Sequence, residues 1–220
     1  MTMIKGFIFD LDGVIVDTAK YHFIAWQALA RELGIDFREE DNEALKGISR
    51  KKAFDILLSL GGLTLTEAQK RNCLKKKNRH YLDLVDKLGK EEILPGVLPF
   101  LKALQEKSFK IALGSASRNA RRVLDHLNLT AYFHVIIDGN QVENPKPHPE
   151  VFLMAAEALG LPPENCLVFE DAQAGIEAAK AAGMFSVGIG DKETLSQADL
   201  VIPGFYKESP EGLLQRFLTL

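Results

Sequence analysis

A short apolar run near the start of the chain ends abruptly in two carboxylates and a glycine. It begins at Ile4 and gives way to Asp10, Asp12 and Gly13. Such a run, bounded by turn residues, is typical of a buried strand in a parallel sheet. Alternate residues of a strand face the same way, roughly 7 Å apart at about 3.3 Å per residue. Asp10 and Asp12 are therefore predicted to project together, although an ordinary strand end followed by a turn uses the same residue types.

Beyond Ile93 the sequence alternates between strand and helix patterns. This alternation predicts a parallel sheet with helices on both faces. The predicted strands are 110–113, 134–137, 166–169, 185–189 and 200–202, and the predicted helices are 97–107, 119–127, 149–159, 172–182 and one near the carboxyl end. The run that begins at Ile4 supplies the first strand of the same sheet.

The stretch from Thr18 to Leu88 shows helical periodicity and no strand signal. Ser49 is a suitable N-cap and Thr66 opens a capping box. The basic run 75–77 is expected to form a solvated helix face. The predicted helices are 18–33, 39–46, 49–60 and 66–88. The fold class is therefore α/β, with a Rossmann-like parallel-sheet core of residues 1–17 and 92–220 and an inserted all-helical cap domain of residues 18–91.

Composition excludes several classes of partner. The 220 residues, 46% hydrophobic and 26% charged, are ordinary for a globular protein. A formal net charge of −3 gives no electrostatic reason to expect nucleic acid or an anionic membrane as partner. No apolar run approaches the roughly 20 residues of a membrane-spanning helix, and the start of the chain lacks a signal-peptide pattern. Cys73 and Cys166 fit no metal-binding spacing, so we expect buried small side chains and a cytoplasmic location.

Three further predicted strand ends or loops carry polar residues. One strand runs into Ser115 and a helix start, where hydroxyls and free N–H groups offer an anion site, unless Ser117 simply caps the helix. A proline-rich loop fixes the direction of Lys146, although loop lysines are more often solvated. Another strand ends in Glu170 and Asp171, the second of which could instead cap the next helix.

Strand ends of a parallel sheet meet at one edge, which would gather these side chains. Several carboxylates placed this close repel one another and raise one another's pKa values unless a cation lies between them. A hard divalent ion with oxygen ligands, most naturally Mg²⁺, resolves the repulsion and also binds phosphates. The gathered residues are Asp10, Asp12, Glu170 and Asp171, with Ser115 and Lys146.

Taken in this order, the four motifs resemble those of the haloacid dehalogenase superfamily of phosphoryl-transfer enzymes, and the resemblance covers the whole chain. It implies that Asp10 is the nucleophile that forms an aspartyl-phosphate. It also implies that Asp12 is the general acid/base and offers its backbone carbonyl to Mg²⁺. The dehalogenase branch does not need this second carboxylate, so Asp12 favours phosphoryl chemistry. The implied metal ligands are Asp10, Asp12, Glu170 and Asp171, and the implied holders of the transferring phosphoryl group are Ser115 and Lys146.

Two cap segments further resemble the sugar phosphomutases of this superfamily, namely the stretch after Asp17 and the loop that ends at Arg50. A mutase must hold a bisphosphorylated sugar by the phosphate that is not reacting, and an arginine fork suits that task. Arg118 departs from the pattern, in which a lysine is expected. The implied substrate-binding residues are Thr18, His22, Trp26, Lys46, Gly47, Ile48, Arg50, Lys77, Ser115, Ala116, Ser117, Arg118, Asn119 and Lys146.

The activity implied by the resemblance is a Mg²⁺-dependent interconversion of β-D-glucose 1-phosphate and β-D-glucose 6-phosphate through a 1,6-bisphosphate. The expected partner is a small phosphorylated sugar, bound by a monomer, with no nucleic acid and no membrane. A sugar-phosphate phosphatase of the same fold would share every core residue and would differ in admitting water. A non-catalytic phosphosugar-binding protein is the third alternative, and the complete set of Asp10, Asp12, Lys146 and Asp171 argues against it.

Overall fold

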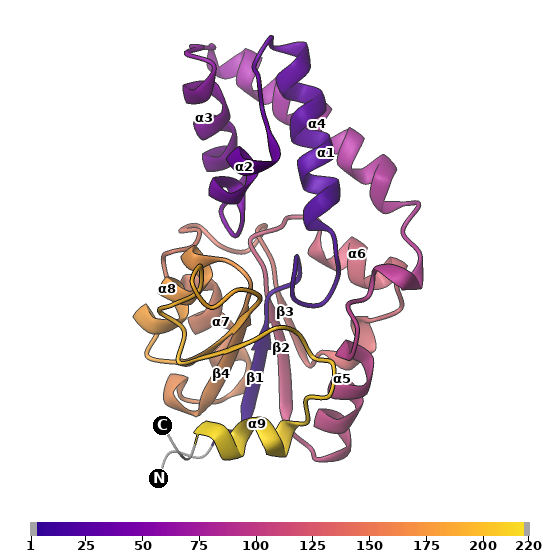
Figure 1. Ribbon diagram of the computed structural model, residues 1–220, viewed down its shortest axis with the longest axis vertical. Coiled ribbons are helices and arrows are strands. Elements are labelled where there is room, and N and C mark those ends of the chain that lie inside the picture. Colours follow the sequence, from indigo (N-terminus) through magenta and orange to yellow (C-terminus); the bar gives the residue numbers. More distant parts are fainter. Residues whose placement is uncertain (1–3, 218–220) are drawn as a thin grey trace.

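The computed structural model describes residues 4–217, which form a sheet of parallel strands below a group of helices (Figure 1). The strands are β1 (Gly6–Phe9), β2 (Lys110–Gly114), β3 (Val135–Ile137), β4 (Cys166–Glu170), β5 (Phe185–Ile189) and β6 (Leu200–Ile202). The helices are α1 (Ala19–Glu32), α2 (Glu39–Asn42), α3 (Arg50–Leu60), α4 (Glu67–Val85), α5 (Val97–Glu106), α6 (Ala120–His126), α7 (Glu150–Leu159), α8 (Gln173–Ala181) and α9 (Pro210–Phe217). Short 3₁₀ turns lie at Glu43–Leu45, Lys90–Glu92, Thr130–Tyr132 and Pro163–Asn165.

Strand β1 lies in the middle of the sheet, whose order is β3-β2-β1-β4-β5-β6. Every pairing between neighbouring strands is parallel. Phe9 of β1 is in register with Leu113 of β2 and with Phe169 of β4. The chain order reverses on either side of β1, and such a switch point is where open α/β sheets leave a crevice for a ligand. Asp10 follows Phe9 directly and therefore lies at this crevice.

Both faces of the sheet are covered, which explains why β1 is apolar at every position. Phe7 and Phe9 belong to a hydrophobic cluster with residues of α5, α6 and α9. Ile8, which points the other way, belongs to a second cluster with residues of α7 and α8. Figure 1 shows α5 and α9 apart from α7 and α8 in the same way. The predicted doubly covered parallel sheet is confirmed.

Helices α1 to α4 lie together above the carboxyl ends of the strands (Figure 1). A third hydrophobic cluster, which includes Trp26, Phe54 and Leu57, is built from this part of the chain alone. The last turns of α4 are different, because Tyr81 and Val85 belong to the cluster of the sheet. Where the chain passes between the two parts, Asp17 N–H donates to the Glu92 carbonyl at 2.8 Å.

Two sequence expectations about single side chains are wrong. The basic run at 75–77 is not uniformly solvated, because Lys77 is only 2% exposed while its two neighbours face solvent. Cys166 is buried as expected, whereas Cys73 is only partly buried. Both errors have one cause: helical periodicity gives the faces of α4 but not which face a neighbouring element will cover.

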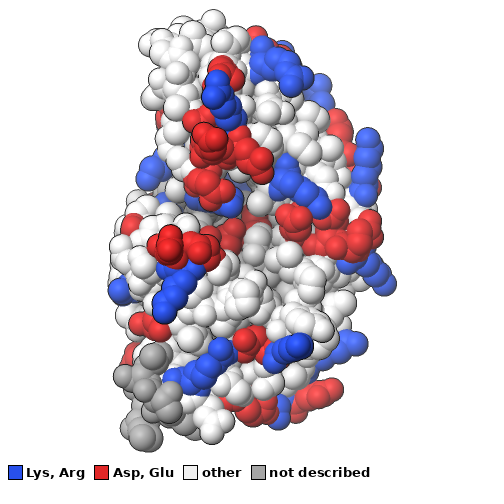
Figure 2. Space-filling model, in the orientation of Figure 1, with Lys and Arg blue, Asp and Glu red and all other residues white. Residues whose placement is uncertain are grey.

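The surface carries charges of both signs. Figure 2 shows Lys and Arg interspersed with Asp and Glu over the visible face, in keeping with the formal net charge of −3. Among the described residues, no helix combines the length and the apolar character needed to cross a membrane.

Candidate active site

Asp10 is held at the carboxyl end of β1 by bonds to both of its carboxylate oxygens. Lys146 Nζ lies 2.7 Å from Oδ1, and the Asp12 backbone N–H donates to Oδ2 at 3.1 Å. The lysine comes from the proline-rich loop, where the Lys146–Pro147 peptide is cis. Asp10 is 4% exposed and Lys146 is 1% exposed, so the pair is almost completely removed from water. The sequence predicted that these two residues meet, and the structure brings them into contact.

Lys146 also forms an ion pair with the Glu170 carboxylate at the end of β4. The other oxygen of Glu170 accepts hydrogen bonds from the Asp171 and Ala172 backbone N–H groups, at 3.1 and 3.3 Å. Glu170 is fully buried, and every one of these contacts fixes its direction. The ammonium group therefore contacts two carboxylates, of which the sequence assigned Asp10 to the nucleophile and the metal site and Glu170 to the metal site.

A group of three carboxylates is suited to a cation. Single oxygens of Asp10, Glu170 and Asp171 all lie within 4.8 Å of one another. Gly13 makes room for this group: its φ is +74°, and a Cβ atom there would come within 2.0 Å of an Asp171 oxygen. The Asp12 side chain is not part of the group, so its predicted place in the metal site depends on its backbone carbonyl.

The pKa values show how costly this crowding of carboxylates is. Burial raises the pKa of Glu170 to about 7, although Lys146 opposes the shift. Burial and the charges of Glu170 and Asp10 raise the pKa of Asp171 well above its ordinary range. Burial alone would lower the pKa of Lys146, but its two carboxylate partners more than offset this and raise it. Within residues 4–217 Asp171 forms no ion pair, which leaves one carboxylate of the group for a further cation.

Asp12 also lines the pocket, and its side chain lies against Thr18, the residue before α1, and His22 of α1. The Thr18 hydroxyl donates to Asp12 Oδ1, and His22 Nε2 lies 3.7 Å from the same oxygen. Burial, followed by the charge of Asp10, raises the pKa of Asp12 to about 6. The two carboxylates of the Asp-x-Asp pattern therefore differ: Asp10 is paired with a lysine, whereas Asp12 accepts from a neutral hydroxyl.

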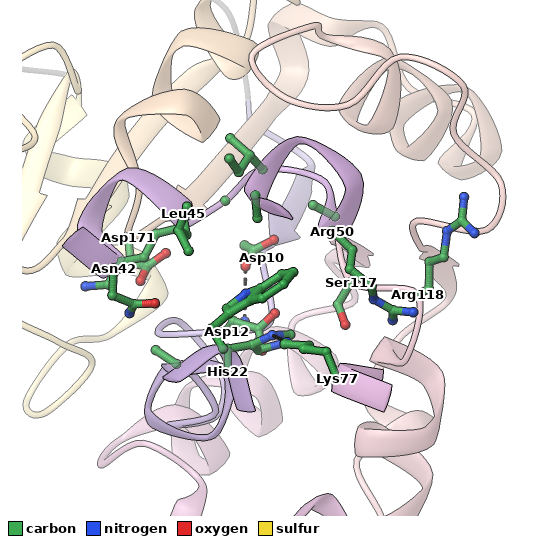
Figure 3. A pocket seen from close by; sticks show the side chains of 17 residues that line it. Asp10, Asp12, His22, Asn42, Leu45, Arg50, Lys77, Ser117, Arg118 and Asp171 are labelled. Atoms are coloured by element: carbon green, nitrogen blue, oxygen red, sulfur yellow. Dashed lines mark hydrogen bonds and ion pairs between the residues drawn. The ribbon is translucent and has the colours of Figure 1, made fainter. Parts of the chain in front are cut away.

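Cationic and polar side chains face the carboxylates from the other side of a pocket (Figure 3). Arg50 comes from the start of α3, where the Ser49 hydroxyl caps the helix as predicted by accepting from Lys52 N–H at 3.3 Å. Figure 3 shows the Arg50 side chain beside Ser117, whereas the Arg118 guanidinium points away from them, and Arg118 Nε–H donates to the Gly139 carbonyl at 3.1 Å. Burial and the Arg118 charge lower the pKa of Arg50. Among the described residues Arg50 has no acidic partner.

Lys77 is the most unusual cation of the site. Its Nζ lies 2.8 Å from His22 Nδ1, 4.5 Å from the centre of the Trp26 ring and 5.0 Å from that of Tyr81. Burial and the Arg50 charge lower the pKa of Lys77 well below its ordinary value. Burial and Lys77 likewise lower the pKa of His22 well below its ordinary value. The cap resemblance thus located Lys77 better than the charge pattern did.

The predicted substrate-binding residues divide between two places. Most line the pocket of Figure 3, namely His22, Trp26, Lys46, Gly47, Ile48, Arg50, Lys77, Ala116, Ser117 and Arg118. The other four do not line it: Thr18 and Ser115 are fully buried, Lys146 is paired with Asp10 and Glu170, and the Asn119 amide donates to Asn78 Oδ1 of α4 at 2.8 Å. Gly47, with φ +69°, brings the cap loop so close to Ala172 of the core that a Cβ atom would lie 2.8 Å from it.

Sequence reasoning missed four residues of this pocket, which are Ala19, Asn42, Leu45 and Ala53. Leu45 and Ala53 fill space beside the loop and belong to the third cluster. Asn42 is the informative omission, because a polar side chain that is only 7% exposed faces the carboxylates' side of the pocket (Figure 3). The only feature of the sequence that could have pointed to Asn42 is its position one turn before the loop that leads to Arg50.

The family model of haloacid dehalogenase-like hydrolases matches residues 4–183. The chain therefore belongs to the haloacid dehalogenase-like hydrolase family. Along 200 residues, 90% of this chain and 88% of the relative, it is 45% identical to the β-phosphoglucomutase of Bacillus subtilis. It is also 35% identical to a phosphorylated carbohydrates phosphatase of Thermotoga maritima, with 82% of each chain covered. A crystal structure of β-phosphoglucomutase from Clostridium difficile superposes with a TM-score of 0.95 at 43% identity, with 99% of this chain and 98% of that chain covered.

Proposed function

We propose that the chain is a phosphomutase that interconverts β-D-glucose 1-phosphate and β-D-glucose 6-phosphate through β-glucose 1,6-bisphosphate. One observation carries the proposal: cations lie at two places around the pocket. Lys146 contacts Asp10 but does not itself line the pocket, whereas Arg50 and Arg118 line it and have no acidic partner in residues 4–217. Two separate cationic places suit a sugar that carries two phosphates. The 45% identity to a β-phosphoglucomutase supports the same substrate class.

Asp10 is proposed as the nucleophile. Its carboxylate is oriented by Lys146 and by the Asp12 N–H, so one oxygen can attack phosphorus as the bond to the sugar oxygen breaks. A carboxylate that approaches a phosphate meets charge repulsion, and the Lys146 ammonium offsets it. Ser115, buried at the end of β2, is proposed to hold the same phosphoryl group with Lys146.

Asp12 is proposed as the general acid/base. It would donate a proton to the departing sugar oxygen, and it would later accept one from the hydroxyl that receives the phosphoryl group. Thr18 fixes the Asp12 carboxyl by a hydrogen bond to one oxygen, which leaves the other oxygen for the sugar. Help of this kind typically contributes about 10²–10⁴-fold to a rate.

The acidic group of Asp10, Glu170 and Asp171 fits a divalent metal ion, and Mg²⁺ is the proposed occupant. Its oxygen donors are those that Mg²⁺ prefers, and the unpaired Asp171 carboxylate is the donor that most needs a cation. When bound, the ion would supply Lewis-acid stabilisation of phosphate charge. We propose that the Asp12 backbone carbonyl joins these carboxylates.

The remaining substrate-binding residues are proposed to hold the sugar and its second phosphate. Arg50, with Ser117, Arg118 and Asn119, would hold the phosphate that is not reacting. The other members would surround the sugar ring, namely His22, Trp26, Lys46, Gly47, Ile48, Lys77 and Ala116. The bisphosphate must then turn over between the two half-reactions, so that each phosphate meets Lys146 once.

We also propose that residues 18–91 act as a cap domain on a core of residues 1–17 and 92–220. The separate hydrophobic cluster of α1 to α4 and the close contact of Gly47 with Ala172 support this division. Closure of such a cap would exclude water, so that the aspartyl-phosphate passes to sugar rather than hydrolysing. We expect a cytoplasmic monomer.

A sugar-phosphate phosphatase is the second candidate, favoured by the similarity to the Thermotoga phosphatase. The discriminating experiment supplies β-glucose 1-phosphate, Mg²⁺ and a trace of the 1,6-bisphosphate, and follows glucose 6-phosphate and inorganic phosphate side by side. We expect glucose 6-phosphate with little free phosphate, and loss of both products when EDTA removes the metal. Mostly free phosphate would establish the phosphatase instead.

A further inference from the structure

A second and larger cavity adjoins the catalytic pocket and shares Arg50, Ala116 and Arg118 with it. Its volume is about 630 Å³, whereas the pocket of Figure 3 has about 70 Å³. It is formed by α3 and α4 of the cap and by the loops that follow β2 and β3. Ligand pockets in proteins usually measure about 300–1,000 Å³, so of these two cavities it is the second that has room for a whole sugar phosphate while the cap stays in place.

The lining of this cavity is strongly basic. Besides the two arginines that it shares with the catalytic pocket, Lys51, Lys52, Arg71 and Lys75 line it. All four are exposed, and none has an acidic partner within residues 4–217. The lining acids are Asp55, which is already paired with Lys70 at 2.8 Å, and Glu143. The lining of this cavity is therefore predominantly basic, although the formal net charge of the whole chain is −3.

The cavity also leads to the reacting end of the site. Ser115 and Lys146 belong to its lining, as do Arg50, Ala116 and Arg118, which it shares with the catalytic pocket. An anion in the cavity would thus be next to the residues proposed to hold both phosphates. Clefts lined by one sign of charge concentrate counter-ions and raise association rates by about 10–10³-fold.

We propose that this cavity is a basic vestibule, a binding site for sugar bisphosphates outside the catalytic pocket. Lys51, Lys52, Arg71 and Lys75 capture the polyanion there before the cap admits it past Arg50 and Arg118. The ligand class rests on the proposed function, but the vestibule affects the rate at which the ligand binds and not the chemical step. Its effect therefore falls on association and on kcat/KM at low salt, and not on kcat.

The test compares two variants that remove the same amount of charge. The vestibule variant is K51Q/K52Q/R71Q/K75Q. The control variant is K5Q/R31Q/K102Q/K192Q, whose four residues are exposed, line neither cavity and have no ion-pair partner among the described residues. Both variants carry Asp10→Asn, so that association of β-glucose 1,6-bisphosphate is measured without turnover. The fluorescence of Trp26, the single tryptophan of the chain, reports arrival in the catalytic pocket.

We expect the association rate of the vestibule variant to fall about tenfold at 20 mM salt, against less than twofold in the control. The difference should vanish at 1 M salt, where the Debye length is only about 3 Å. With Asp10 restored, kcat should stay within twofold of that of the unaltered chain.

Equal losses in the two variants would assign the effect to net charge and overturn the vestibule, and so would no loss in either. Both results leave the proposed function untouched. Absence of any fluorescence response to the bisphosphate would overturn both proposals. Free phosphate instead of glucose 6-phosphate in the activity assay would overturn the mutase alone, because association is measured without turnover.

Discussion

The core side and the cap side of the pocket both bury charged groups, but they treat them differently. On the core side Lys146 lies between Asp10 and Glu170, so a buried cation meets two buried anions. On the cap side Lys77 is buried and Arg50 is partly buried, and neither contacts an acid. The pKa of each of these two residues is lowered. On the core side the lysine is paired but the Asp171 carboxylate has no ion pair within residues 4–217, whereas on the cap side it is the cations that lack an anion.

This difference indicates which charged groups of the pocket lack a partner that a ligand could supply. An unpaired buried charge is costly, and proteins keep one mainly where function needs it. The Lys146 ion pairs are complete without substrate, whereas Asp171 lacks a cation. On the proposed function, a phosphate of the substrate would compensate Arg50, and ligand binding would then favour the closed cap. The following variants test this contrast between the core side and the cap side.

Asp10→Asn should have the largest effect, a loss of mutase activity of at least about 10⁴-fold, because an amide is a poor nucleophile towards phosphorus. A coupled glucose 6-phosphate assay and uptake of phosphate from acetyl phosphate measure it. Asp83→Asn, at an exposed position on α4 outside both cavities, is the matched control and should keep full activity. Phosphate uptake by the Asp10→Asn protein would contradict its role as nucleophile.

Lys146→Met and Arg50→Met compare the two sides in stability. The first should cost about 3–5 kcal/mol of unfolding free energy in metal-free buffer, because it leaves Asp10 and Glu170 buried without a cation. The second removes a charge that has no partner and should change stability by less than about 1 kcal/mol. Urea unfolding with EDTA present measures both. Similar losses in the two variants would show that the cap arginine is as fully compensated as the core lysine.

Arg50→Ala should impair the mutase reaction, which needs the non-reacting phosphate to be held, more than formation of the aspartyl-phosphate. We expect kcat/KM of the mutase reaction to fall about 100-fold, the loss of a charge-assisted arginine–phosphate contact. Formation of the aspartyl-phosphate from acetyl phosphate depends on the core side and should change only severalfold. Rapid-quench measurement of the phosphoenzyme gives the second rate. An equal loss in both reactions would remove Arg50 from the distal phosphate.

Lys77→Met should have the smallest effect, which is a change in how the free energy of unfolding varies with pH. The pKa of Lys77 is lowered in the folded chain from its ordinary value of 10.5, so the unfolded chain binds more protons between the two values. Stability of the unaltered protein therefore rises with pH across that window, by about 1.4 kcal/mol per pH unit from this group. The variant should lack this contribution.

Urea unfolding at a series of pH values below 10.5 measures the slope. Lys75→Met, two residues earlier on α4 and exposed, is the control and should keep the slope of the unaltered chain. Parallel curves for Lys77→Met and the unaltered chain would mean that Lys77 is charged in the folded state.

Much of the core site follows from the sequence, because a parallel sheet places the carboxyl ends of its strands at one edge. Once the strands before Asp10, Ser115 and Glu170 are recognised, their meeting needs no further information. The starts of α3 and α4 were also well marked, since the Ser49 cap and the Thr66 capping box are local hydrogen-bond patterns, whereas the end of α4 at Val85 comes before the predicted Leu88. On the cap side, composition and periodicity alone were less informative, and the resemblance pointed to Arg50 and Lys77.

The sequence by itself therefore determined the parallel core, the inserted helices and the set of carboxylates at the edge of the sheet, all of which depend on local periodicity and strand direction. Only the tertiary structure decided that Lys146 bridges Asp10 and Glu170, that Lys77 is buried while Lys75 is solvated, and that a basic cavity opens beyond Arg50. The physical reason is that burial and pairing of a charge are set by which surfaces meet. Residues more than a hundred positions apart then share one low-dielectric site, and no local pattern encodes that contact.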